Sequence, residues 1–411
     1  MDPGNTAWML AATALVLFMT PGLALFYGGM VRGKNVLGML MQNIFAMGLL
    51  AVVWAAIAFS LAFGDAGNGG FIGNFDFAWL KDVGPSLPPD GYGIVLTIPF
   101  VLFCAYQMTF AIITPALITG ATADRLKFSA YAVFIGVWLV LVYGPIAHMV
   151  FAGGWLADMG ALDFAGGAVV HMNAGAAALA LVLLIGKRKG YPDTPMQPHN
   201  LPLTVLGTGI LWFGWAGFNA GSALAADGIA GQAIMNTFLA ASAAMLGWLV
   251  VERLKDGHAT TLGAASGAVA GLVAITPCAG FVGGMAPVYI GLIAGAVCYL
   301  ALGIKKTFGF DDSLDVVAVH LVGGLAGSLL LGFFADAAIN PAVTNEGVFL
   351  GGGGSLLGDQ IVASVVTIAY SFVVSLAIGL VIDATMGLRI DDAAEDEGLD
   401  LSQHAEVAYA E

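Results

Sequence analysis

The chain has 411 residues, of which 59% are hydrophobic and only 10% charged, and its mean hydropathy is +0.91. This composition excludes a soluble globular domain and predicts an integral membrane protein with many spans. The net charge of −14 says little about the body of the protein, because residues 389–411 hold eight acidic residues and one arginine. We therefore treat these residues as a separate hydrophilic tail.

Eleven apolar segments, separated by charged residues and by clusters of proline and glycine, follow one another along the chain. We predict that each is a transmembrane helix, since about 20 apolar residues rising about 1.5 Å each cross ~30 Å of hydrocarbon. The eighth is marginally long enough. No positively charged region precedes the first, so we expect a true span and no signal peptide. The predicted limits are 6–30, 37–63, 93–121, 128–151, 167–186, 201–222, 230–251, 260–277, 286–304, 316–335 and 360–387.

The basic residues support this number of spans. Twelve of the thirteen follow odd-numbered spans, and only Lys81 lies on the other side. Because cytoplasmic loops are rich in lysine and arginine, we predict an external N-terminus and a cytoplasmic C-terminus. One span too many or too few in the middle of the chain would place the basic loops on both sides of the membrane. We expect a multi-pass protein of the cell (plasma) membrane.

The two halves of the chain share short polar motifs. Asp163 precedes His171 by eight residues, Asp312 precedes His320 by eight, and Ile-Thr-Pro occurs in the third and eighth spans. Matching positions are five spans apart, and because five is odd the two sets run in opposite directions. We predict an all-α integral membrane fold of eleven transmembrane helices with inverted five-helix repeats and an extra C-terminal span. The predicted units are the transmembrane domain 1–388, with repeats about 6–190 and 200–336 and the extra span about 360–387, and a regulatory tail 389–411.

The two histidines of this motif indicate a functional path, because ionisable residues inside membrane spans commonly mark a substrate or ion route. Each histidine lies about 12 Å further along the helix than its aspartate, toward the centre of the membrane. We therefore expect the two imidazoles to meet near the middle of the membrane. The aspartates have a structural alternative, since an acid at a helix N-terminus caps free N–H groups. The other histidines are expected to be interfacial or solvated: His148, His199, His258 and His404.

Aromatic residues recur at helical spacing in two spans. Trp215, Phe218 and Ser222 lie at i, i+3 and i+7 of the sixth span, and Tyr106 and Phe110 at i and i+4 of the third. Aromatic faces attract a desolvated cation, and a hydroxyl accepts one of its N–H donors. For either of these two sets of residues alone, packing between helices is the alternative explanation of the spacing. Together with the histidines, the stripes predict capture of a small cation followed by a narrow apolar passage.

The sequence carries little that indicates an enzyme. It has no Ser/His/Asp set, and the histidines lack an adjacent nucleophile. Its three cysteines have no metal-ligand spacing, and we expect them to be small buried hydrophobic residues. We expect no enzymatic activity, cofactor, metal ion or nucleic-acid partner.

Several long motifs occur in the order and spacing of a known family. They are FYGGMVRGKN, GATADRLKFSA, GALDFAGGAVVHMNAG, GFNAGSAL, AGLVAITPCAGFV, DDSLDVVAVHLVGG and EGLDLSQHAEVAYAE. Over essentially its whole length the chain resembles the ammonium transporter (Amt/Mep/Rh) family, most closely its prokaryotic Amt branch. The resemblance implies a homotrimer in which each subunit has its own narrow hydrophobic pore.

The resemblance also implies roles for individual residues. Phe110 and Phe218 correspond to a stacked phenylalanine gate, and His171 and His320 to twin histidines joined through their ring nitrogens. The outer ammonium site and its surroundings correspond to Tyr106, Asp163, Trp215 and Ser222, of which Asp163 supports the site without touching ammonium and Trp215 also lines the pore. Thr276 corresponds to a threonine near the inner pore.

One residue departs from the bacterial pattern of the family. Phe151 stands where that pattern has a tryptophan stacked on the bound ammonium. Because phenylalanine offers a weaker cation–π surface than tryptophan, we expect less tight capture or greater dependence on Phe110 and Tyr106.

The resemblance leads to a mechanistic hypothesis. Ammonium binds outside, loses its proton at the phenylalanine gate, and crosses as ammonia to be reprotonated inside, with separate proton movement along the histidines as an open alternative. Methylammonium is a second substrate to consider. The tail resembles the cytoplasmic element against which a P-II class nitrogen regulatory protein binds, and its end, with Leu399, Leu401, Val407 and Tyr409, suggests docking. An ammonium sensor with little flux is the alternative function.

Overall fold

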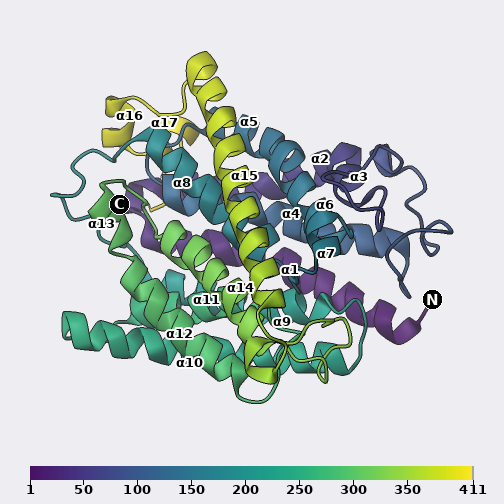
Figure 1. Ribbon diagram of the computed structural model, residues 1–411. Helices are drawn as coiled ribbons and strands as arrows, with labels where there is room; N and C mark the ends of the chain where they lie inside the picture. The colour runs from purple at the N-terminus through teal and green to yellow at the C-terminus, as the bar shows by residue number, and fades with distance from the viewer. Residues whose placement is uncertain (410–411) are drawn as a thin grey trace.

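The computed structural model describes residues 1–409, so Ala410 and Glu411 of the predicted tail lie outside the described residues. Within this part of the chain all regular elements are helical, and the β-type pairing consists of one isolated antiparallel bridge between Leu126 and Arg389. The helices form one bundle, in which the first and second halves of the chain lie side by side (Figure 1).

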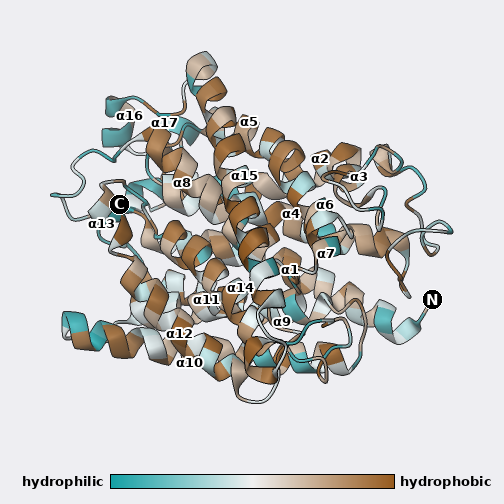
Figure 2. Cartoon of the chain, viewed as in Figure 1, coloured by the Kyte–Doolittle hydropathy of each residue, from teal (hydrophilic) through white to brown (hydrophobic). Residues whose placement is uncertain are grey.

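Ten helical segments in residues 1–409 are long and apolar enough to cross a membrane. Together with the shorter apolar helix α11 (Thr261–Ile275) they make up the eleven predicted spans, so the all-α, multi-span fold class is confirmed. Apolar residues cover most of this bundle, and hydrophilic residues concentrate at its ends (Figure 2). The ten segments are α1 (Pro3–Met30), η1–α3 (Gly33–Phe63), α4 (Phe100–Thr122), α5–α7 (Phe128–Met159), η5–α8 (Gly167–Ile185), α9 (Leu201–Gly221), α10 (Gly228–Asp256), α12–α13 (Ala286–Phe308), η6–α14 (Val317–Phe334) and α15 (Ser355–Met386).

The third span begins later than the sequence predicts. Helix α4 starts at Phe100, whereas the predicted limit of 93 falls in a non-helical segment. Pro99 is its N-cap residue, and a proline disfavours helical backbone in the residue before it. The apolar residues upstream, such as Leu96 and Ile98, are buried without being helical.

Glycines allow the closest approaches between helices. A Cβ atom on Gly207 of α9 would lie 2.3 Å from the backbone nitrogen of Phe26 in α1, and one on Gly175 of α8 would lie 2.5 Å from the backbone nitrogen of Leu321 in η6 (Val317–Val322). Helices in membranes associate chiefly by van der Waals packing, so small residues at such contacts let the backbones meet. The Gly175 contact also brings the two histidine-bearing segments together.

The tail is ordered and lies on one end of the bundle (Figure 1). Its helices are α16 (Asp392–Glu397) and α17 (Leu399–His404). Glu395 is buried, where it pairs with Arg389 at 2.5 Å and accepts the backbone N–H of Lys189 at 2.7 Å. Leu399 is buried too, as the docking hypothesis requires. Three further residues of this end are exposed in the single chain, although the Tyr409 hydroxyl lies 2.9 Å from the His199 Nε2, and their docking against another subunit stays a prediction: Leu401, Val407 and Tyr409.

We predict that Gly207→Ala lowers the free energy of unfolding by about 1–3 kcal/mol, because the new methyl group meets the backbone of α1. Gly209→Ala, two residues further along the same helix, is the matched control, since its Cβ would have nothing within 4 Å. Thermal unfolding of the purified protein in detergent measures the difference. Equal melting temperatures for the two variants would contradict this account of the contact.

Candidate functional site

The two histidine-bearing spans begin in the same unusual way. Each starts with a π-helical turn, η5 (Gly167–Met172) or η6, and in each an aspartate carboxylate accepts backbone N–H groups of the first turn. Asp163 accepts four, from residues 166–169, at 2.7–3.2 Å. Asp312 accepts those of Val316 at 3.1 Å and Val317 at 2.7 Å. These bonds confirm the capping roles expected from the sequence, and they give both carboxylates hydrogen-bonding partners.

The two histidines are in direct contact inside the bundle. The Nδ1 atoms of His171 and His320 are 3.2 Å apart, and the side chains are 1% and 3% exposed. A neutral imidazole carries one N–H, so one ring donates through Nδ1 and keeps a bare Nε2, while the other accepts and carries its proton on Nε2. Among residues 1–409 the Nε2 atom of His171 has no hydrogen-bond partner. The pair therefore has one free acceptor and one free donor at its two outer nitrogens.

Aromatic rings continue from the histidine pair toward the Asp163 end of the bundle. The His171 ring stacks on Trp215 with centroids 5.5 Å apart, and Phe218 follows 5.2 Å from Trp215. The rings of Phe218 and Phe110 approach to 4.4 Å at an interplanar angle of 47°. Trp215 is fixed by its Nε1–H, which donates to the Thr276 hydroxyl at 3.0 Å. Two spans from each half of the chain thus contribute to one row of rings.

A cavity of about 200 Å³ lies beyond the phenylalanine pair, and we call it the outer cavity. Aromatic rings, one hydroxyl and one carboxylate converge on it, a combination suited to a small cation that donates hydrogen bonds. Its lining residues include Gln107, Phe110, Phe151, Asp163 and Ser222. Four of these are predicted site residues that lie far apart in the sequence.

Gln107 is a lining residue that sequence reasoning missed. It is 9% exposed, and within the described chain its Oε1 atom has no hydrogen-bond partner. The available signal was an amide in a span without charged residues, one residue after Tyr106 and three before Phe110. Such a group costs free energy unless something pairs with it, which makes it a candidate contact for a substrate.

Tyr106, Trp215 and Thr276 do not line the outer cavity. Tyr106 is fully buried, and its hydroxyl lies 2.9 Å from the Phe218 carbonyl oxygen and 3.3 Å from the Ser222 Oγ. It therefore lies behind Ser222 and holds it in place. Trp215 lines the narrow cavity described next, and Thr276 supports Trp215 from behind.

A much smaller cavity, of about 10 Å³, follows on the other side of the phenylalanine pair. This narrow cavity holds about one water-sized sphere. Its polar lining residues are His171, His320 and Trp215, and the others are apolar: Met19, Leu23, Phe26, Ile113, Leu117, Val170, Leu211, Phe218 and Val269. An ion would lose nearly all its hydration there, whereas a small neutral molecule would not carry that cost.

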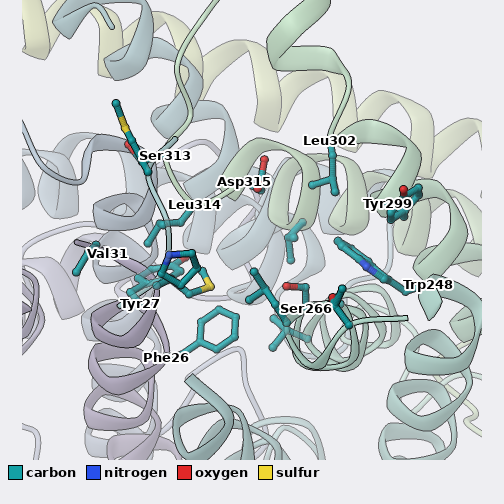
Figure 3. A pocket seen from close by; sticks show the side chains of 18 of the residues that line it. Phe26, Tyr27, Val31, Trp248, Ser266, Tyr299, Leu302, Ser313, Leu314 and Asp315 are labelled. Carbon is teal, nitrogen blue, oxygen red and sulfur yellow. Dashed lines mark hydrogen bonds between the residues drawn. The ribbon is translucent and has the colours of Figure 1, made fainter. Parts of the chain in front are cut away.

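A third cavity, of about 280 Å³, opens beyond His320, and we call it the inner vestibule (Figure 3). His320 lines both it and the narrow cavity. The aromatic side chains of Phe26, Tyr27, Trp248 and Tyr299 surround it, and Asp315 lies at its margin (Figure 3). The vestibule is also lined by charged groups of both signs, namely Arg32, Asp124, Arg188, Glu252 and Asp256. The three cavities thus follow one another through the bundle.

Ion pairs connect the segments that lie next to the inner vestibule. Arg188 donates two side-chain hydrogen bonds to the Asp311 carboxylate, each at 2.8 Å, and also approaches Asp124 at 3.6 Å. Burial raises the pKa of the Asp311 carboxyl, but the hydrogen bonds and charge of Arg188 outweigh this effect and hold the pKa below its usual range. This pair connects the loop after the fifth span to the start of the tenth.

The expectation of an interfacial or solvated side chain is wrong for His148. It is 1% exposed, and its Nδ1 and Nε2 atoms lie 3.2 Å from the Ala62 carbonyl oxygen and 3.1 Å from that of Gly69. It therefore connects α6 (Gly144–Phe151) both to the last turn of the second span and to the loop that follows. The three cysteines are buried and unpaired, as expected. Residues 1–409 hold no cluster of three metal-ligating side chains.

Comparisons with known proteins agree over nearly the whole chain. Residues 7–409 match the Ammonium Transporter Family. An ammonium transporter of Mycobacterium tuberculosis is 51% identical over 99% of this chain and 90% of its own length, and the ammonium transporter Amt1 of Archaeoglobus fulgidus is 45% identical over all of both chains.

Solved structures give the same result. Mep2 of Candida albicans superposes with a TM-score of 0.87 at 36% identity, over 96% of this chain and 87% of that one. A structure titled Sensor Amt Protein has a TM-score of 0.87 at 29% identity, over 98% of both chains.

We predict that Asp163→Asn lowers the free energy of unfolding by about 1–2 kcal/mol, because the amide nitrogen cannot accept two of the four N–H groups that the carboxylate caps. Thermal unfolding, together with hydrogen exchange over residues 166–169, measures the effect. Asp158→Asn, at a nearby exposed aspartate, is the control. Unchanged protection of residues 166–169 in the Asp163 variant would refute the capping account.

Proposed function

The chain belongs to the ammonium transporter family, and we propose that it binds ammonium in the outer cavity and passes ammonia through the narrow cavity to the inner vestibule. Members of this family are transporters and not enzymes. The chain is a multi-pass membrane protein. The observation that carries the proposal is the histidine pair, because it sits between the two wider cavities and faces a passage too narrow and apolar for a hydrated ion.

The outer step of the proposal is capture of the cation. Ammonium carries four N–H donors and one charge, which suit the ring faces of Phe110 and Phe151 and the Ser222 hydroxyl. The Asp163 carboxylate, which caps the helix, contributes negative charge to the cavity without direct contact with ammonium. Gln107 lines the same cavity. When its terminal amide group rotates so that Oε1 faces the cavity, this oxygen accepts a hydrogen bond from ammonium.

The central step is loss of the proton. A cation entering the narrow cavity gives up its hydration for contacts with apolar side chains, whereas ammonia crosses at low cost. We place deprotonation at the Phe110–Phe218 gate, above Trp215 and the histidines. The bare Nε2 and the Nε2–H of the histidine pair then act as acceptor and donor toward ammonia, and they offer a separate route for the proton. Reprotonation follows in the inner vestibule.

The topology and assembly are further parts of the proposal. We place the protein in the plasma membrane with its N-terminus outside and its C-terminus in the cytoplasm, on the basis of the basic loops. We assign it a homotrimeric assembly, methylammonium as a second substrate, and a P-II class regulator at the cytoplasmic face. The docked tail, with Glu395 tied to Arg389 and to the Lys189 backbone, supports a regulatory role at that face.

An ammonium sensor with little flux is the second candidate, favoured by the similarity to the structure titled Sensor Amt Protein. Electrical recording on proteoliposomes separates the two functions. A sustained ammonium-dependent current over a range of pH supports transport, whereas ammonium binding without sustained flux supports a sensor.

We predict that His171→Ala combined with His320→Ala reduces ammonium current by about tenfold or more, because the passage loses its polar pair and proton route. His171→Asp or His320→Asp should admit potassium, since a carboxylate stabilises a cation in the passage. His258→Ala, at an exposed loop histidine, is the control. Unaltered current and selectivity in the double alanine variant would remove the histidine pair from the mechanism.

We predict that Phe151→Trp lowers the apparent KM for ammonium about two- to fivefold, because tryptophan has the stronger cation–π face. Uptake or current measured over a series of ammonium concentrations gives this value. Phe75→Trp changes an exposed ring outside the cavity and serves as the control. An unchanged or higher KM in the Phe151 variant would count against a role for this ring in capture.

A further inference from the structure

A buried glutamine of the eleventh span is bonded to the chain segment that precedes the outer cavity. Gln360 of α15 is 1% exposed. Its Oε1 accepts the Leu162 backbone N–H at 2.7 Å, and its Nε2–H₂ donates to the Leu162 carbonyl oxygen at 2.9 Å. The side-chain amide therefore pairs with both backbone groups of one residue, as a neighbouring strand would. Nε2 also lies 3.0 Å from the Ser328 Oγ of α14 (Gly323–Phe334).

The segment held in this way is non-helical and leads directly to Asp163. It runs between α7 (Trp155–Met159) and η5, where helical hydrogen bonds cannot satisfy its backbone. Gly160 lies close to α15 as well, since a Cβ atom there would be 2.9 Å from an Asp359 carboxylate oxygen. Asp163 is thus attached on one side through Leu162 and on the other through Phe164, whose N–H donates to the Pro277 carbonyl oxygen at 3.1 Å.

The other buried polar residues of α15 do not make such a contact. Within residues 1–409, Ser364 bonds to Ser328, Ser371 to the Asn173 carbonyl oxygen, and Ser375 to the Trp138 Nε1. These bonds join helix to helix. The Thr367 hydroxyl has no hydrogen-bond partner among the same residues. Gln360 alone in this row reaches the irregular segment, so general packing of α15 does not account for its side chain.

We propose that Gln360 is a positioning residue for ammonium capture, acting by fixing the backbone on which Asp163 and the adjoining wall of the outer cavity are mounted. The inference rests on the proposed function, since it assumes that the outer cavity is the capture site. It also gives the eleventh span, which lies outside the predicted repeats, a part in the transport path. A polar side chain buried in a span is costly unless it is paired, and here each end of the amide is paired with the segment it holds.

The test compares Gln360→Met with Ser364→Ala in the full-length protein. Methionine keeps the volume of glutamine and removes both bonds to Leu162, whereas the serine variant removes a polar contact one helical turn away. We expect Gln360→Met to raise the apparent KM for ammonium about three- to tenfold with little change in maximal current, because capture is weakened and the narrow cavity is untouched. Ser364→Ala should leave both values near those of the wild type.

Hydrogen exchange gives a second readout that does not depend on transport activity, and the amides of the other helices report whether the variant is folded. In the wild-type protein the Leu162 amide should exchange slowly although it lies outside any helix, and in Gln360→Met its exchange should accelerate. An unchanged KM in a folded Gln360→Met variant, or rapid exchange of Leu162 in the wild type, overturns the inference. If Ser222→Ala also leaves the KM unchanged, the capture site itself is wrong. A shift in Ser222→Ala alone removes only the role of Gln360.

Discussion

The cost of moving a charge into hydrocarbon governs the arrangement of this protein. Full charges lie at the ends of the path, and at its centre the titratable lining residues are two histidines, which share a hydrogen bond at 3.2 Å. The carboxylates of Asp163 and Asp312, which precede the two histidines on their spans, are each engaged with helix N–H groups. A path built in this way favours a neutral small molecule over an ion, without requiring a mechanical gate that distinguishes them.

The same constraint applies to the non-helical connection between the fourth and fifth spans. Backbone that is not helical is tolerated at membrane depth when it is buried in protein or lines a cavity. The segment before η5 meets this condition through the Asp163 cap, the Gln360 pairing and the bond from Phe164 to Pro277. The free N–H groups at the start of η5 are satisfied, so this segment positions residues around the outer cavity at little cost in stability.

Part of this site could be predicted from the sequence because it depends on short periodic patterns. The Asp-x₇-His motif located both histidines and both caps, since helical rise converts eight residues into a fixed depth. The aromatic stripes located Phe110, Phe218 and Ser222 for the same reason. The contacts of His148 with Gly69 and of Gln360 with Leu162 could not be predicted, because these partners are backbone groups of irregular segments whose path no periodicity reveals. The start of α4 was missed because hydropathy does not separate a helix from a buried extended segment.

The two ends of the path differ in chemistry although the halves of the chain share their motifs. The outer cavity joins several aromatic rings to one hydroxyl and one carboxylate that is already bonded to a helix, so its attraction for a cation is moderate and local. The inner vestibule holds several carboxylates together with Arg32 and Arg188, and the tail docks at the same end of the bundle. In the transport route we propose, these two ends would serve different tasks: capture of the cation at one, and release into a charged space at the other. This difference between the side chains of the two cavities gives the proposed path a chemical direction.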